Sequence, residues 1–132
     1  MIQILKLFIS HLEYLFRENN FCITHSNCGM SFNSGLIVLE IKNLSLRFIN
    51  ERDIITLEFR FTKEVSSKWY DIDVMRMYLS GVSVDAVMTS VNLAFVKEHI
   101  QKMIDLADEE DVKLFNSIFD KLRKERAEKL FG

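Results

Sequence analysis

The 132-residue chain contains no proline, although an average usage of about 5% would give roughly six. Proline-rich docking segments and rigid proline linkers are therefore excluded. Glycine is also scarce, with four residues. The turns must then be formed mainly by Asn, Asp and Ser, which favours short connections between long regular elements.

The chain also has few cysteines and no large excess of charge of either sign. Two cysteines are too few for the dense disulfide framework of a small secreted domain. Seventeen basic residues against nineteen acidic ones give a net charge of −2. Because nucleic-acid binding usually needs an overall basic field, we expect no nucleic-acid partner.

The N-terminal segment from Met1 to Phe16 lacks the features of a targeting signal. Lys6 is the only Lys or Arg before Arg17, no small-residue cleavage site follows, and the uncharged stretches are far shorter than the roughly 20 residues that span a bilayer. Apolar residues recur there at helical spacing: Leu5, Phe8, Ile9, Leu12, Leu15 and Phe16. We expect a helix packed on the core of a cytoplasmic protein, with no membrane partner.

The remaining composition is that of an ordinary globular protein, with 48% hydrophobic and 27% charged residues. No linker or internal repeat interrupts the chain, so we expect a single domain over 1–132. The middle of the chain has a period of two, clearest at Ile54–Phe61, where apolar and polar residues alternate. Phe21–Thr24 begins as a short strand, and the polar residues Asn50–Asp53 suit a four-residue hairpin connection around a type I turn.

Helical periodicity returns after Ser67. Asp71 is a candidate N-cap and Gly81 a candidate C′ residue of one helix, and Leu93–Ala107 forms the next. Asp108 is a candidate cap of the last helix. Its expected buried side is marked by Phe115, Ile118, Phe119, Leu122 and Leu130.

This order of elements predicts an α+β fold. We expect an antiparallel meander sheet of three to four strands with one face buried. An N-terminal helix and about three C-terminal helices should pack on it.

Cys22, His25 and Cys28 form the only cluster with metal-ligating residue types. A structural zinc site needs four ligands, and a catalytic site needs three and a water molecule. Strand alternation would send His25 to the opposite face from the two cysteines. We therefore expect no metal and no cofactor, and a disulfide is disfavoured in a reducing compartment. A small metal-dependent enzyme built on these residues remains an alternative.

No pattern in the chain matches a catalytic motif. A nucleophile elbow, a P-loop and a dinucleotide-binding glycine motif are all absent. Asp71 and Asp73 would point about 200° apart on a helix, so they cannot form a carboxylate pair there. Their charge is explained by the dipole at a helix N-terminus. We expect no enzymatic activity.

The densest charge lies between the last two expected helices. Five acidic residues fall within seven positions there: Asp105, Asp108, Glu109, Glu110 and Asp111. A helix cap and the dipole require fewer than five, so this acidic cluster is a candidate surface for a positively charged partner, against the alternative of simple solvation. Trp69 and Tyr70 either pack back on the next helix or anchor an interface, where both residue types are enriched.

Two stretches, Lys68–Gly81 and Leu122–Gly132, resemble small bacterial immunity proteins. These are the cognate inhibitors of polymorphic and contact-dependent growth inhibition toxins. The resemblance covers about a fifth of the chain. It implies a cytoplasmic protein that binds one toxin domain tightly and has no activity of its own. Many such toxins are nucleases with basic clefts, which an acidic surface would complement.

We therefore expect a non-catalytic inhibitor of a cognate toxin domain, with a basic nuclease as one candidate partner. Its predicted partner-binding residues are the acidic cluster with Trp69 and Tyr70. The main alternative is a homo-oligomeric scaffold or adaptor, such as a homodimer, with Phe8, Phe16 or Phe119 in the subunit interface.

Overall fold

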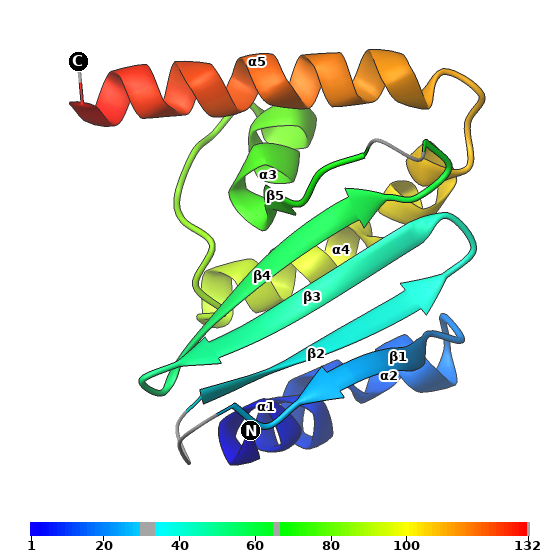
Figure 1. Cartoon of the computed structure of the whole chain (residues 1–132), viewed down its shortest axis with the longest axis vertical. Helices are drawn as coiled ribbons and strands as arrows, with labels where there is room; N and C mark the ends of the chain where they lie inside the picture. The colour runs from blue at the N-terminus through cyan, green and yellow to red at the C-terminus, as the bar shows by residue number, and fades with distance from the viewer. Residues whose placement is uncertain (30–33, 65–66, 132) are drawn as a thin grey trace.

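The computed structural model describes residues 1–29, 34–64 and 67–131. Within them the chain forms a five-stranded antiparallel sheet in the order β1-β2-β3-β4-β5, with one helical segment before it and three helices after it (Figure 1). The helical segments are α1 (Ile2–Leu7), the π-helix η1 (Phe8–Leu12), α2 (Glu13–Arg17), α3 (Ile72–Ser80), α4 (Ser90–Ala107) and α5 (Val112–Phe131). The strands are β1 (Cys22–Asn27), β2 (Ser34–Ile41), β3 (Leu44–Glu51), β4 (Ile54–Phe61) and β5 (Tyr70–Asp71). The predicted α+β class is confirmed, and the sheet has one strand more than expected.

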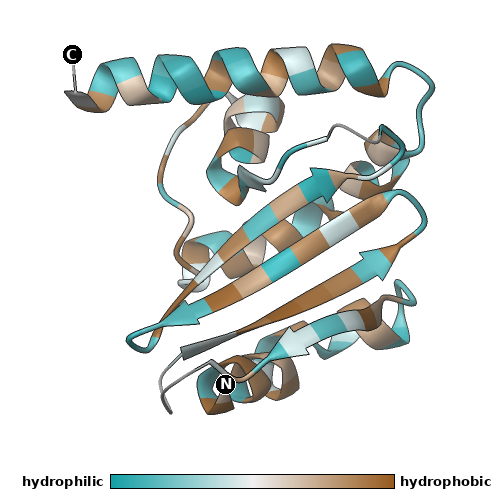
Figure 2. Ribbon diagram, in the orientation of Figure 1, coloured by the Kyte–Doolittle hydropathy of each residue, from teal (hydrophilic) through white to brown (hydrophobic). Residues whose placement is uncertain are grey.

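The core of the sheet lies where β3 and β4 pair. Three cross-strand pairs put apolar side chains on the same face: Phe48 with Leu57, Leu46 with Phe59, and Leu44 with Phe61. All six are buried. Polar residues occupy the alternate positions of β4, and this gives the bands of colour along the strand in Figure 2. The alternation expected for Ile54–Phe61 is therefore confirmed.

The hairpin between β3 and β4 is tighter than predicted. Asn50 and Glu51 still pair in the ladder, so only Arg52 and Asp53 form the turn. Both have positive φ, at 53° and 64°, as in a type I′ turn. This turn type matches the right-handed twist of the flanking strands, which explains why a wider type I connection is not used.

The helices cover one face of the sheet. The N-terminal helical segment and α4 lie behind it in the view of Figure 1, and α3 and α5 pack together at the β5 end. On the opposite face the described part of the chain places no helix (Figure 1). That face carries half-buried polar side chains of β3 and β4, among them Arg47, Glu58 and Arg60.

The last helix differs from its expected form at both ends. It begins at Val112, so Asp108 does not cap it and instead follows the last turn of α4. Leu130, expected on the buried side, is 67% exposed, because the C-terminal end of α5 extends beyond the rest of the fold (Figure 1). Phe119 is fully buried and Phe8 nearly so, which leaves neither as a subunit contact, and Phe16 is half-buried.

The connection from α3 to α4 pairs with β4. The amide of Leu57 donates to the carbonyl of Ala86 at 3.0 Å, and the amide of Met88 donates to the carbonyl of Ile55 at 2.8 Å. Together with β5, this segment covers the outer edge of β4. Among the helices of the described residues, none combines the length and apolarity required to cross a bilayer.

Candidate partner-binding surface

The acidic cluster occupies the connection between α4 and α5. Asp105 lies in the last turn of α4, Asp108 follows that helix, and Asp111 precedes α5. The side chains of all five members are exposed. The turn therefore presents five carboxylates to solvent within one short segment.

This turn is fixed to the end of the sheet by three contacts. The amide of Asn43, in the β2–β3 turn, donates to Oδ1 of Asp108 at 2.8 Å. Lys63 Nζ, which follows β4, lies 3.2 Å from the carbonyl oxygen of Asp108 and 3.3 Å from that of Glu109. The backbone that carries the acidic side chains is thus held in place before any partner binds, which lowers the entropy cost of binding.

Three carboxylates of the cluster remain unengaged. Glu109, Glu110 and Asp111 have no side-chain hydrogen bond or ion pair within the residues that the structure describes, whereas Asp105 accepts a bond from Gln101 at 3.0 Å. Neighbouring like charges without counter-ions create a negative potential, which attracts a cationic surface. These three groups are the part of the cluster best placed to contact a partner.

Trp69 lies on the helix-free face of the sheet and does not pack on α3. Its ring is covered by two guanidinium groups, with the Arg47 carbon at 4.3 Å and the Arg60 carbon at 4.9 Å from the ring centroid. Arg47 also donates to Oε1 of Glu58 from Nε at 2.9 Å and from a terminal nitrogen at 2.6 Å. Trp69 is half-buried in this stack, so part of the residue remains accessible.

Tyr70 belongs to the core. Its side chain is 1% exposed, and its hydroxyl donates to Oδ1 of Asp120 at 2.9 Å and lies 3.2 Å from the carbonyl oxygen of Asn116. The ring packs against Phe59 and Phe119. Tyr70 therefore offers almost no surface to a partner, and the predicted Trp69–Tyr70 pair divides between an exposed face and the interior.

Two tyrosines should ionise late. Burial, with the hydrogen bond to Asp120, raises the pKa of Tyr70 to about 12, and burial with the nearby charge of Glu18 raises the pKa of Tyr14 to about 12. An unfolded tyrosine ionises near pH 10, so the free energy of unfolding should fall as pH rises from about 10 to 12. We expect ultraviolet titration to show fewer late-ionising groups in the Tyr14→Phe/Tyr70→Phe variant. Ionisation of both residues near pH 10 with the circular dichroism unchanged would contradict their burial.

The expected separation of Cys22 and His25 is wrong. A β-bulge lies between Ile23 and His25, so Cys22 pairs with Glu40 and His25 with Val38. These two partners are two residues apart on β2, and this places Cys22 and His25 on the same face of the sheet. Even so, the described residues contain no group of three or more His, Cys, Asp or Glu that could hold a metal ion.

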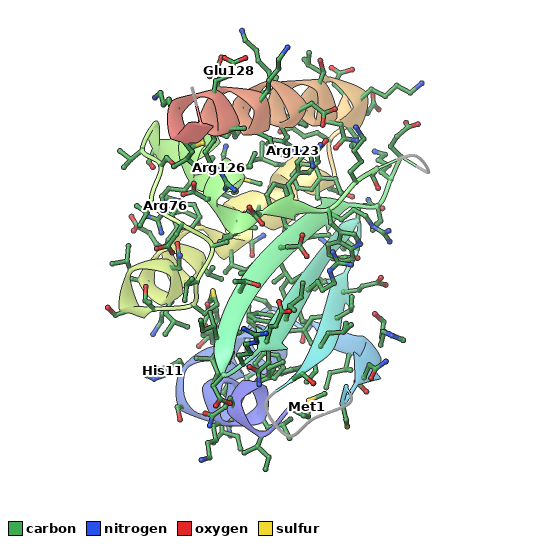
Figure 3. All side chains as sticks on the ribbon, turned by 60° about the vertical axis from the view of Figure 1, so that its left-hand side comes forward. Met1, His11, Arg76, Arg123, Arg126 and Glu128 are labelled. Atoms are coloured by element: carbon green, nitrogen blue, oxygen red, sulfur yellow. The ribbon has the colours of Figure 1, made fainter. Side chains whose placement is uncertain are left out.

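Asp71 and Asp73 take part in a contact that the sequence analysis missed. A terminal nitrogen of Arg126 lies 2.6 Å from Oδ2 of Asp71, and the other lies 3.4 Å from Oδ2 of Asp73. Figure 3 shows Arg126 on the side of α5 that faces α3. Asp73 also accepts bonds of 2.6 Å from the Ser83 hydroxyl and from the Val84 amide. The two carboxylates thus hold α5 and the α3–α4 connection against the start of α3. Asp71 and Arg126 are 55 positions apart, so no local sequence pattern indicates this ion pair.

A scan against protein-family models found no match, and searches of curated proteins and of solved structures found none either.

Proposed function

We propose that this chain is a non-catalytic inhibitor, an immunity protein that neutralises a cognate bacterial toxin by forming a tight complex with it in the cytoplasm. The observation that carries the proposal is the set of unengaged carboxylates on the anchored α4–α5 turn: Glu109, Glu110 and Asp111. The resemblance of Lys68–Gly81 and Leu122–Gly132 to immunity proteins supports the same function.

The charges suggest how such an inhibitor would recognise its target. A negative turn increases the rate at which a basic surface associates, and it disfavours acidic surfaces through repulsion. Because the turn is anchored by Asn43 and Lys63, little conformational freedom is lost on binding. A toxin domain with a basic cleft, such as a nuclease, is the partner that fits this surface. The accessible part of Trp69 is a further candidate contact, near the same end of β4.

Charge reversal in the turn tests the proposal. The Glu109→Lys/Glu110→Lys variant should bind the toxin about 10- to 100-fold more weakly at low salt, mainly through slower association and with a smaller salt dependence. The measurement is surface plasmon resonance at several salt concentrations with a purified partner.

The matched control reverses two acids of the same type elsewhere. Glu125 and Glu128 are exposed on α5, and Figure 3 shows Glu128 on the outer side of that helix. The Glu125→Lys/Glu128→Lys variant changes the net charge by the same amount, so it reports the effect of charge alone. Equal loss of affinity in the two variants would remove the acidic turn from the recognition mechanism.

A further inference from the structure

The two edges of the sheet differ in how they are covered. On the β4 side, β5 pairs with Glu58 and Phe59, and the segment around Val87 pairs with Ile55, Thr56 and Leu57. On the other side, β1 pairs with β2 and has no further neighbour among the described residues (Figure 1). One sheet edge therefore leaves backbone amides and carbonyls open to another strand.

This free edge has few of the features that usually prevent strand addition. Cys22–Asn27 contains no charged residue and no proline, and all six residues are exposed. The bulge at Thr24 is the one protective feature of this edge, and it interrupts the pairing with β2 locally. Natural sheets protect exposed edges with charge, proline or covering elements, so an uncharged edge of this length is a site for pairing with another chain.

An exposed apolar flank of the N-terminal helical segment lies beside this edge. Three of its side chains are largely in solvent: Ile2 at 55%, Leu5 at 45% and Ile9 at 76% exposure. The opposite flank, with Gln3 and Ser10, lines a shallow pocket with Ile55 of β4. Since β4 and β1 lie on opposite sides of the sheet, the apolar flank points toward the β1 side, where Ile23 is also 52% exposed.

We propose that a second copy of this chain docks here and forms a two-fold symmetric dimer. Antiparallel pairing of β1 with the same strand of the partner subunit would continue the sheet across the dimer axis, and the two apolar helix flanks would pack together on one side of it. A two-fold contact places each surface against itself. The absence of charge in Cys22–Asn27 therefore removes the repulsion that a charged edge would suffer.

The available area is sufficient for a dimer of moderate affinity. The exposed apolar surface amounts to on the order of 300 Å² over four side chains: Ile2, Leu5, Ile9 and Ile23. Exposed apolar patches of this area on a monomeric protein are often interaction sites. Adding the strand edge brings each partner toward the roughly 800 Å² of a standard interface. We expect a dissociation constant on the order of micromolar, at the weak end of the range that interfaces of this size show.

Sedimentation velocity of the full chain from about 0.5 to 200 μM tests the proposal across that affinity range. The wild type should change from monomer to dimer with increasing concentration. Ile9→Lys and Ile23→Lys should each weaken the dimer by at least 10-fold, because a charge would be placed at the contact. Both positions are exposed, so circular dichroism and the melting temperature should stay close to those of the wild type.

The matched control is Leu114→Lys, an apolar side chain that is 58% exposed on α5. It should leave the dimer unchanged. A wild type that stays monomeric at every concentration overturns the proposal, and so does a dimer that loses affinity in the control variant but not in the two edge variants.

Disulfide trapping tests the arrangement of the strands. Both cysteines are free and exposed. Within one chain Cys22 and Cys28 are separated by an extended strand of about 20 Å, too far for an internal disulfide. In the proposed dimer the two strands are centred on His25, so Cys22 lies near Cys28 of the partner subunit and oxidised dimers should contain mainly this mixed pair by peptide mass spectrometry. A mixture in which Cys22–Cys22 and Cys28–Cys28 pairs are as common would overturn the edge-to-edge arrangement.

Discussion

Truncation of Phe119 to alanine should lower the free energy of unfolding by about 3–5 kcal/mol. The side chain is fully buried, and five aromatic rings surround it with centroids at 5.2–6.3 Å: Phe59, Phe61, Tyr70, Tyr78 and Phe115. Most of these contacts are edge-to-face, the arrangement in which aromatic pairs add stability beyond area burial. Removal of the ring would leave a cavity between α5 and the sheet and would remove the aromatic contacts that join them. Urea denaturation followed by circular dichroism measures the loss.

Leu114→Ala is the control for this substitution. Leu114 lies on the same helix but is exposed, so its removal should change the free energy of unfolding by no more than about 0.5 kcal/mol. A Phe119→Ala variant as stable as the control would mean that α5 does not pack on the sheet as described.

The second large effect is expected at Asn92, which is fully buried at the start of α4. Its side-chain amide donates to the carbonyls of Val87 at 2.7 Å and Asp85 at 2.9 Å, and its oxygen accepts a hydrogen bond from Arg76. Within the described part of the chain, no other acceptor contacts the Arg76 guanidinium, which lies over the ring of Phe95 at 4.5 Å. Asn92→Leu should therefore cost about 3–5 kcal/mol by leaving a buried charge without its acceptor.

A double variant identifies the cause of that loss. Replacing both partners, as Arg76→Met/Asn92→Leu, removes the buried charge together with its acceptor, and such replacements are often near neutral. The double variant should therefore recover a large part of the stability lost in Asn92→Leu. If thermal and urea denaturation show that the loss in the double variant equals the sum of the losses in Arg76→Met alone and Asn92→Leu alone, the hydrogen bond is not what stabilises this region.

The regular parts of the fold could be predicted from sequence because they depend on local patterns. Alternation along Ile54–Phe61 and helical spacing along Leu93–Ala107 each report one buried face, and both elements are present. Gly81 ends α3 in the left-handed conformation at φ 74°, as expected of a C-terminal glycine. These features require no knowledge of distant residues.

The remaining features depend on partners that are far apart in the chain. One extra residue at Thr24 changes the face on which His25 lies, and no feature of the sequence marks that bulge. Arg126 binds Asp71 and Asp73 across more than 50 positions, and no local pattern indicates that contact. Tyr70 is a predicted partner-binding residue, but its strand β5 pairs with β4 and directs the ring inward.

The acidic cluster was predicted as a set of residues but not as a fixed structure. Sequence spacing placed the five acids together between two helices. It did not show that Asn43 and Lys63 would hold their backbone, since these residues precede Asp108 by 65 and 45 positions in the chain. Their contribution turns a charged loop into an anchored surface that a partner can recognise.

Growth rescue is the most direct test of whether this chain neutralises a toxin by binding it. A partner captured with the tagged protein at low salt, and identified by mass spectrometry, is produced in bacteria alone or together with this chain. We expect the partner alone to stop growth, the wild type to restore it, and Glu109→Lys/Glu110→Lys to restore it less well than Glu125→Lys/Glu128→Lys. A partner that is harmless alone, or growth that stays arrested although the wild type binds the partner, would contradict the proposed inhibition.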